Sequence, residues 1–263
     1  MSASAANLES MGPGTAAEEV LDAFHRPRGS EADSAYLAQE ELVINEEVLM
    51  DEHGYAVMMK WEQPLMKSHA DFICGREGSQ GSPSHCGAML NIGFGMGLVD
   101  DAIQSHSPAL HVICEAHPQV LARAEAWAKG KSNVRLAPGR WQDVLLAKVE
   151  ALGPGFMFDG VFFDTYEETV EDLLPLLSRI LRPGGRFSYC NVYQPHQAER
   201  NVAFSAYLAG RLSALGFRAA FRPLSVAVPT PEEWLGAKSP YWLHATYLVP
   251  HCFRGDEPTT PGG

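Results

Sequence analysis

The stretch MLNIGFGMGL at residues 89–98 decides the fold of this chain. An apolar run ends in a cluster of glycines, and a segment with a helical pattern follows. A strand, a tight turn and a helix N-terminus in this order are typical of an α/β sheet that accepts a nucleotide-like cofactor. The glycine turn is therefore the first candidate for a ligand site.

The spacing of the glycines distinguishes two kinds of cofactor. A dinucleotide fingerprint reads G-x-G-x-x-G, which would place its third glycine at position 98, but Leu98 stands there. The third glycine comes one residue earlier, at Gly97, and G-x-G-x-G is the spacing of sites for S-adenosylmethionine (SAM). Glycine clusters alone are more often ordinary turns, so this interpretation depends on the elements that follow.

Strand and helix patterns alternate beyond the glycine turn. The sequence predicts strands at 88–92, 110–115, 134–137, 159–164 and 186–189, and helices at 97–104, 118–129, 142–150, 169–181 and 203–215. A helix at 58–74 and a Gly/Ser-rich loop at 75–87 precede them, and an antiparallel pair at 217–228 and 245–249 follows. Alternating βα units predict a doubly wound α/β fold with a parallel sheet and ligands at the carboxyl ends of its strands.

Composition narrows the classes of function. The chain has 263 residues, of which 46% are hydrophobic, and a net charge of −12. This charge argues against nucleic-acid binding and suits either a cationic substrate or an ordinary acidic protein. No apolar run is long enough to span a membrane, and no C-x-x-C pair suggests zinc. We therefore expect a metal-free protein in the cytoplasm, with the nucleus as a second location.

The chain divides into three parts by composition. Residues 1–35 lack hydrophobic periodicity and are predicted to be disordered apart from a short helix at 16–24; residues 36–253 form the folded domain, and 254–263 a frayed tail. Between residues 29 and 59 acidic residues accumulate without any Lys or Arg. This stretch is either a solvated acidic face or a docking surface for a basic protein.

Two segments beyond the glycines extend the predicted cofactor pocket. Glu115 ends the second strand, where an acid can accept hydrogen bonds from ribose hydroxyls. His117 follows it and is equally compatible with the pocket and with the surface. Arg140 and Trp141 lie in the loop after the third strand, where they could stack on the adenine or offer backbone groups to it. A buried core position is the alternative for Trp141.

Two carboxylates are predicted to bind the substrate. Asp164 ends the DGVFFD strand beside the expected methyl donor. Glu62 lies in the helix before the sheet, with Met58 and Met66 four residues to either side on the same predicted face. Both acids could accept hydrogen bonds from a guanidinium fork and take up its proton. The bland alternatives are a helix cap for Asp164 and a solvated side chain for Glu62.

Several strings together resemble a known family, the guanidino-group N-methyltransferases. They are VMMKWEQPLM (57–66), LNIGFGMGLVD (90–100), HSPALHVICEAHP (106–118), GRWQDVL (139–145) and FDGVFFDTY (158–166). The family includes guanidinoacetate methyltransferase and the fungal-type protein arginine N5-methyltransferase, and the strings lean to the arginine branch. The resemblance implies a seven-stranded, Rossmann-like sheet of the class I SAM-dependent type.

The resemblance also implies roles for individual residues. The positions similar to the family's cofactor site are Met58, Met66, Gly93, Phe94, Gly95, Met96, Gly97, Leu98, Glu115, Ala116, His117, Arg140 and Trp141. Glu62 and Asp164 resemble the acids that bind the guanidino group, and Asp164 also adjoins the cofactor.

The function implied is methyl transfer from SAM to the internal (N5) nitrogen of arginine in a protein, with S-adenosylhomocysteine as product. A ribosomal protein is one candidate substrate. A small-molecule guanidino methyltransferase of the creatine-forming type and a SAM-binding scaffold without catalysis remain alternatives. The sequence leaves open whether the protein is a monomer or a homodimer.

Overall fold

The computed structural model describes residues 36–39, 41–75, 86–166, 168–192, 198–238 and 240–255. The expectations for residues 1–35, for most of the 75–87 loop and for the tail beyond residue 255 lie outside these ranges. The strands are β1 (Val43–Ile44), β2 (Val48–Met50), β3 (Ala56–Met59), β4 (Ala88–Ile92), β5 (Leu110–Glu115), β6 (Val134–Pro138), β7 (Phe158–Phe163), β8 (Leu181–Tyr189), β9 (Phe217–Ser225) and β10 (Thr246–Arg254). The α-helices are α3 (Gln63–Ile73), α4 (Leu98–Ser105), α5 (Pro118–Ala128), α6 (Trp141–Leu152), α7 (Leu174–Ile180) and α8 (Ala198–Ala214), and the 3₁₀ turns are η2 (Lys60–Glu62), η3 (Val170–Asp172) and η4 (Glu232–Trp234).

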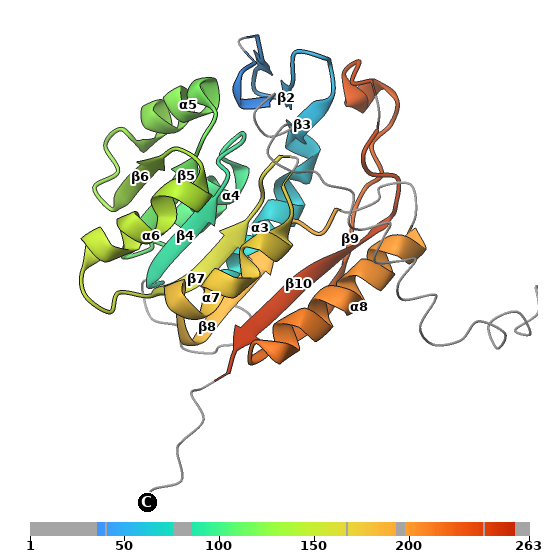
Figure 1. The fold of residues 1–263 in the computed structure, drawn as a ribbon. Helices are drawn as coiled ribbons and strands as arrows, with labels where there is room; N and C mark the ends of the chain where they lie inside the picture. The colour runs from blue at the N-terminus through green and yellow to red at the C-terminus, as the bar shows by residue number, and fades with distance from the viewer. Residues whose placement is uncertain are drawn as a thin grey trace, which may run out of the picture.

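The main sheet has seven strands in the order β6-β5-β4-β7-β8-β10-β9 (Figure 1). The first five strands in this order pair in parallel, and β10 pairs antiparallel with both β8 and β9. The predicted fold class, including the antiparallel C-terminal pair, is therefore confirmed. Within the described part of the chain, no helix is both long and apolar enough to cross a membrane.

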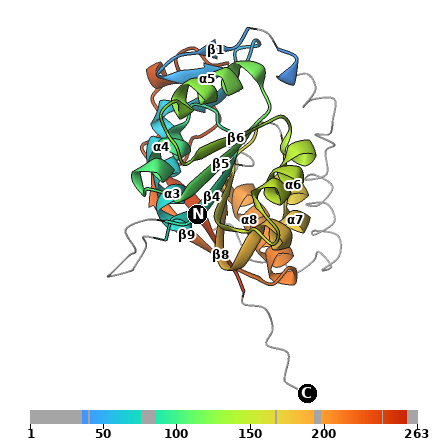
Figure 2. The same cartoon turned by 90° about the vertical axis from the view of Figure 1, so that its left-hand side faces the viewer.

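The sheet is covered by helices on both faces (Figure 2). One apolar cluster joins the sheet to α6, α7 and α8, and a second joins it to α3, α4 and α5. Successive side chains of a strand point to opposite faces; accordingly Leu90 and Ile92 of β4 belong to the first cluster, whereas Met89 belongs to the second. This burial on both faces explains why the central strands are almost continuously apolar.

β4 and β7 are parallel neighbours in the sheet, and the order in which successive strands are added across the sheet reverses between them. From β4 the chain proceeds outward through β5 and β6, and then returns to β7 on the other side of β4. Ile92 at the end of β4 pairs in register with Phe163 at the end of β7. Ligands of open α/β sheets bind at such a switch point, outside the carboxyl ends of the strands.

The helix predicted for residues 58–74 is wrong in its first turns. Met58 and Met59 are paired in β3, opposite Leu49 and Val48 of β2, and the α-helix begins only at Gln63. Pro64 is at the start of α3, where its missing N–H costs no hydrogen bond. Met58 therefore does not share a helix face with Glu62. The small sheet β1–β2–β3 itself was not predicted, because its strands have only two to four residues.

Other boundaries also differ from the prediction: β8 begins at Leu181 rather than at residue 186, and α8 at Ala198 rather than at residue 203. The helix expected at 169–181 is divided into η3 and α7, because Pro175 begins a new helix, and Leu181 already belongs to β8. At the C-terminus β10 includes Arg254, which the sequence placed in the frayed tail. The guanidinium of Arg254 donates to the carbonyl of Ser178 (2.9 Å), and this contact holds the strand end against α7.

Candidate active site

The glycine turn between β4 and α4 is held in close contact with β7. Gly93 has φ of +94°, a conformation that L side chains rarely adopt, and a Cβ atom there would overlap the carbonyl oxygen of Asp164. The backbone N–H of Asp164 donates to the carbonyl of Ile92 (2.9 Å). The position of the glycine turn and that of the acid after β7 are thus fixed by the same backbone contact.

Met58 reaches the glycine turn from β3 rather than from a helix. Its Sδ atom lies 3.3 Å from the backbone N of Met96, and a Cβ on Gly95 would approach the same sulfur to 2.9 Å. Met66, one turn into α3, is fully buried in the apolar cluster that also contains Met58, Phe94 and Met96. The methionines are therefore brought together as predicted, but by a strand and a helix.

Glu115 lies across the glycine turn at the end of β5. Its carboxylate accepts the backbone N–H of Phe94 (2.8 Å) and, through its other oxygen, those of Ala116 and His117 (2.8 Å each). Burial raises the pKa of Glu115, and these hydrogen bonds oppose the shift. The acid therefore fixes both loops at this edge; the ribose contact proposed for it stays a prediction.

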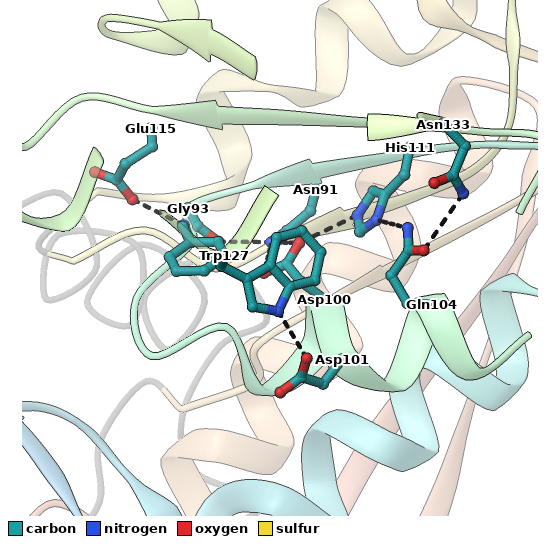
Figure 3. Close-up of polar contacts among 10 residues, drawn as sticks. Asn91, Gly93, Asp100, Asp101, Gln104, His111, Glu115, Trp127 and Asn133 are labelled. Carbon is teal, nitrogen blue, oxygen red and sulfur yellow. Dashed lines mark hydrogen bonds and ion pairs between the residues drawn. The ribbon is translucent and has the colours of Figure 1, made fainter. Parts of the chain in front are cut away.

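A buried polar network lies beneath the glycine turn (Figure 3). The side-chain amide of Asn91 donates to the carbonyl of Gly93 (2.8 Å) and to the carboxylate of Asp100 (2.9 Å). The Asp100 carboxylate lies 3.1 Å from Nε2 of His111, and Nδ1 of His111 lies 3.0 Å from the amide of Gln104. Asn91, Asp100 and His111 are fully buried. The network therefore fixes the carbonyl at which the turn begins.

This network was not predicted from the sequence, although a signal was present. Asn91 interrupts the apolar run of β4, and His111 interrupts the apolar run of the neighbouring β5. A polar residue inside a buried strand needs a partner. The pairing of β4 with β5 supplies it, through Asp100 on the helix that follows the glycines.

Asp164 and Glu62 form the second half of the site. Asp164 follows β7, and burial raises its pKa to about 7, while the thiol of Cys190, at the end of β8, donates to the carboxyl group and partly opposes the rise. Glu62 ends η2 and is 4% exposed. Burial raises the pKa of Glu62 to about 8, and the charge of Asp164 adds to the shift. The surroundings of both acids disfavour the ionised carboxylates, and a bound cation would stabilise them. The site is therefore suited to a cation.

The remaining predicted residues follow β5 and β6 at the carboxyl edge of the sheet. Trp141 is buried against Phe163, and its indole N–H donates to Glu168 (2.6 Å), so the core position considered for Trp141 is the one observed. Arg140 lies 3.6 Å from the same carboxylate. His117 caps α5 by accepting the backbone N–H of Gln119. Contacts of these residues with the cofactor stay predictions.

The described residues contain no group of three or more His, Cys, Asp or Glu side chains arranged to hold a metal ion. The polar groups at the site are carboxylates, backbone amides and a thioether. This set suits an organic cation and a cofactor bound through backbone contacts.

Comparisons with known proteins agree with this arrangement. Residues 28–200 match the family described as guanidinoacetate N-methyltransferase. Protein arginine N-methyltransferase 2 of Yarrowia lipolytica is 33% identical over 208 residues, covering 74% of this chain and 42% of the relative. The protein of the same name from Aspergillus fumigatus is 32% identical, covering 85% and 51%. The chain spans about half the length of the curated relatives it matches.

Solved structures share the fold at low sequence identity. Precorrin-6y C5,15-methyltransferase from Geobacter metallireducens superimposes with a TM-score of 0.50 at 14% identity, over 81% of this chain and 94% of that one. Spermidine synthase from Thermotoga maritima gives 0.51 at 12% identity, over 84% and 74%. The fold is that of the class I SAM-dependent methyltransferases.

A substitution at the backbone contact should separate ligand binding from general stability. We expect Gly93→Ala to weaken SAM binding at least about tenfold, because a side chain with positive φ would displace the turn from β7. Gly130→Ala is the matched control, since Gly130 has φ of +80° and open space around its Cβ position. Calorimetric titration with SAM measures both variants; equal affinities would contradict the role of Gly93.

Removing Asp100 should be far more costly than removing its neighbour. Asp100→Ala leaves His111 and Asn91 without their buried partner, which we expect to lower the free energy of unfolding by about 3–5 kcal/mol. Asp101 is exposed and accepts the indole N–H of Trp127 (2.7 Å), so Asp101→Ala should cost about 1 kcal/mol or less. Urea unfolding of both variants tests this difference, and similar losses would show that the network does not support the turn.

Proposed function

Because this chain belongs to the guanidinoacetate N-methyltransferase family, we propose that it transfers a methyl group from SAM to the guanidinium group of arginine in a protein. The curated relatives are named protein arginine N-methyltransferases, which supports arginine as the acceptor. We further propose the internal (N5) nitrogen as the position modified, with ribosomal proteins as the first substrates to test. The strings shared with the arginine branch of the family support both choices.

The observation that carries the proposal is a pair of interacting acids: Glu62 is buried, and Asp164, which adjoins the glycine turn, is half-buried. A guanidinium is planar, remains protonated at neutral pH and presents several N–H donors. Glu62 and Asp164 can accept these donors, and the bound positive charge favours the ionised form of both. An uncharged acceptor would leave the charges of the buried Glu62 and the half-buried Asp164 without compensation, so the site would favour a cation.

The same acids can accept the proton that the reaction releases. Arginine enters as a cation, and the methylated product is again a cation at neutral pH, so one proton is released for each methyl transferred. As the nitrogen forms its bond to the methyl carbon and the carbon–sulfur bond breaks, a carboxylate within hydrogen-bond reach can accept that proton. The backbone contact of Asp164 with the glycine turn supports this role for it.

The residues around the turn fit SAM. When bound, SAM supplies an electrophilic methyl group on its sulfonium centre. Among the described residues the buried hydroxyl of Thr165, directly after Asp164, has no hydrogen-bond partner. A polar ligand in the crevice would satisfy this hydroxyl. Glu115 would hold the loops against the nucleoside side, and Met58 and Phe94 would supply apolar contact.

A small guanidino compound is the second candidate acceptor. The name of the matching family, guanidinoacetate N-methyltransferase, favours it. A free acceptor of this kind carries a carboxylate besides its guanidinium and would need a cationic or amide partner near the two acids. The assay below therefore includes guanidinoacetate as a competitor of protein acceptors.

Methyl transfer can be followed with labelled SAM and fractionated cytoplasmic and nuclear extracts. We expect label in protein which, after hydrolysis, separates as N5-methylarginine. Asp164→Asn should lose most of this activity while SAM affinity stays within about twofold, because the loss concerns the transition state. Glu125→Gln, an exposed acid on α5, is the control. Label only on terminal nitrogens would contradict N5, and label only in guanidinoacetate would favour the second candidate.

The raised pKa values predict the dependence of acceptor use on pH. Free enzyme must ionise Asp164 and Glu62 to bind a guanidinium, and their pKa values are about 7 and about 8. We expect kcat/KM for the methyl acceptor to be low in acid and to rise with pH up to about 8, since protonation of the two carboxylates removes the groups that bind the guanidinium. In kcat the fall should occur at lower pH, because the bound cation favours ionisation. A flat kcat/KM profile between about pH 6 and 9 would argue against this role.

A further inference from the structure

Glu62 is held by two donors that both bind the same oxygen. The backbone N–H of Met59 donates to Oε1 (2.7 Å), which closes the first turn of η2. The hydroxyl of Tyr241 donates to Oε1 as well. Neither bond uses Oε2. The carboxylate is thus fixed in one orientation, with one oxygen occupied and the other available.

Tyr241 comes from a distant part of the chain. It lies in the connection between β9 and β10, 179 residues from Glu62 in sequence. Its ring packs against Trp61 (5.6 Å between ring centroids) and Trp234 (5.1 Å), which are themselves 5.9 Å apart. These three rings, the aromatic trio, hold the Tyr241 hydroxyl in place beside the η2 turn. An isolated tyrosine on a loop would lack this support.

The phenol is a permanent donor in this setting. Burial and the neighbouring charge of Glu62 raise the pKa of Tyr241 well above its ordinary value. Tyr241 therefore stays protonated throughout the range in which Glu62 titrates. Its hydrogen bond favours the ionised carboxylate and opposes the effect of burial on the pKa of Glu62.

We propose that Tyr241 is a positioning residue for the acceptor: it occupies Oε1 of Glu62, so that the carboxylate presents the single oxygen Oε2 to a guanidinium. This inference rests on the proposed function and adds a feature of substrate recognition to it. A guanidinium cannot then bind Glu62 through both carboxylate oxygens. It receives one fixed oxygen from Glu62 and depends on Asp164 for its other partner, so the nitrogen whose proton Asp164 accepts can face the methyl donor.

Substitution of the hydroxyl alone tests the proposal. Tyr241→Phe retains the ring that packs in the aromatic trio and removes only the donor. Tyr207→Phe is the matched control, because it removes a tyrosine–carboxylate bond to Glu171 (2.7 Å) from α8, which covers the sheet face opposite α3. For both variants we would measure SAM affinity, kcat and KM for an arginine acceptor against pH, and the titration of the Glu62 carboxyl by carbon-13 NMR, assigned with Glu62→Gln.

The positioning role has a specific signature. In Tyr241→Phe we expect KM for the acceptor to rise roughly tenfold at neutral pH, since a hydrogen bond to a charged group is lost. The acidic limb of kcat/KM and the titration of Glu62 should move to higher pH, while SAM affinity stays within about twofold. Tyr207→Phe should match the unsubstituted protein in every measurement.

The outcomes separate this inference from the proposed function. An unshifted Glu62 titration in Tyr241→Phe overturns the positioning role, whatever the acceptor is. An unchanged KM and pH profile in an active enzyme overturns it as well. If the unsubstituted protein methylates no guanidino compound, the proposed function fails, and the carboxyl titration still decides whether Tyr241 controls Glu62.

Discussion

The close approach of Gly93 to the backbone of Asp164 is the constraint on which the site depends. Parallel pairing brings Ile92 and Phe163 into register, so the residues after them emerge side by side at the switch point. One is a glycine without a side chain to separate the strands, and the other carries the acid. The cofactor turn and the proposed proton acceptor therefore cannot move independently, which suits a reaction that requires an in-line approach between two bound molecules.

This arrangement places two acids in surroundings that disfavour their charge. Burial raises the pKa of Glu62 to about 8, so its protonated form predominates at neutral pH in the substrate-free site. A guanidinium reverses this balance, because each ionised acid gains a partner. Substrate binding should thus release protons before chemistry begins. The ionised acids are unfavourable in the empty site and are stabilised only by a bound cation. The site therefore selects for cations.

The strand–turn–helix units, and the position of Asp164 at a strand end, could be predicted from sequence because each depends on local patterns. The apolar runs that end at Ile92, Glu115 and Phe163 specify strands, and their shared direction places those ends at one edge. The hairpin that carries Met58 could not be predicted, because its short strands are stabilised by pairing rather than by periodicity. The role of Tyr241 could not be predicted either, since nothing local indicates which carboxylate a loop residue reaches across the fold.

The two acids and the tyrosine that orients one of them lie in different parts of the chain. Glu62, Gly93 and Asp164 fall within residues 28–200, the part of the chain that matches the family, whereas Tyr241 and Trp234 lie beyond it. The connection between β9 and β10 supplies Tyr241, which orients Glu62, and Trp234, which packs against it, whereas Trp61 comes from η2. A change in that connection could alter which guanidino compound is accepted while the methyl-transfer apparatus stays the same, because the orientation of one carboxylate oxygen is set from outside it.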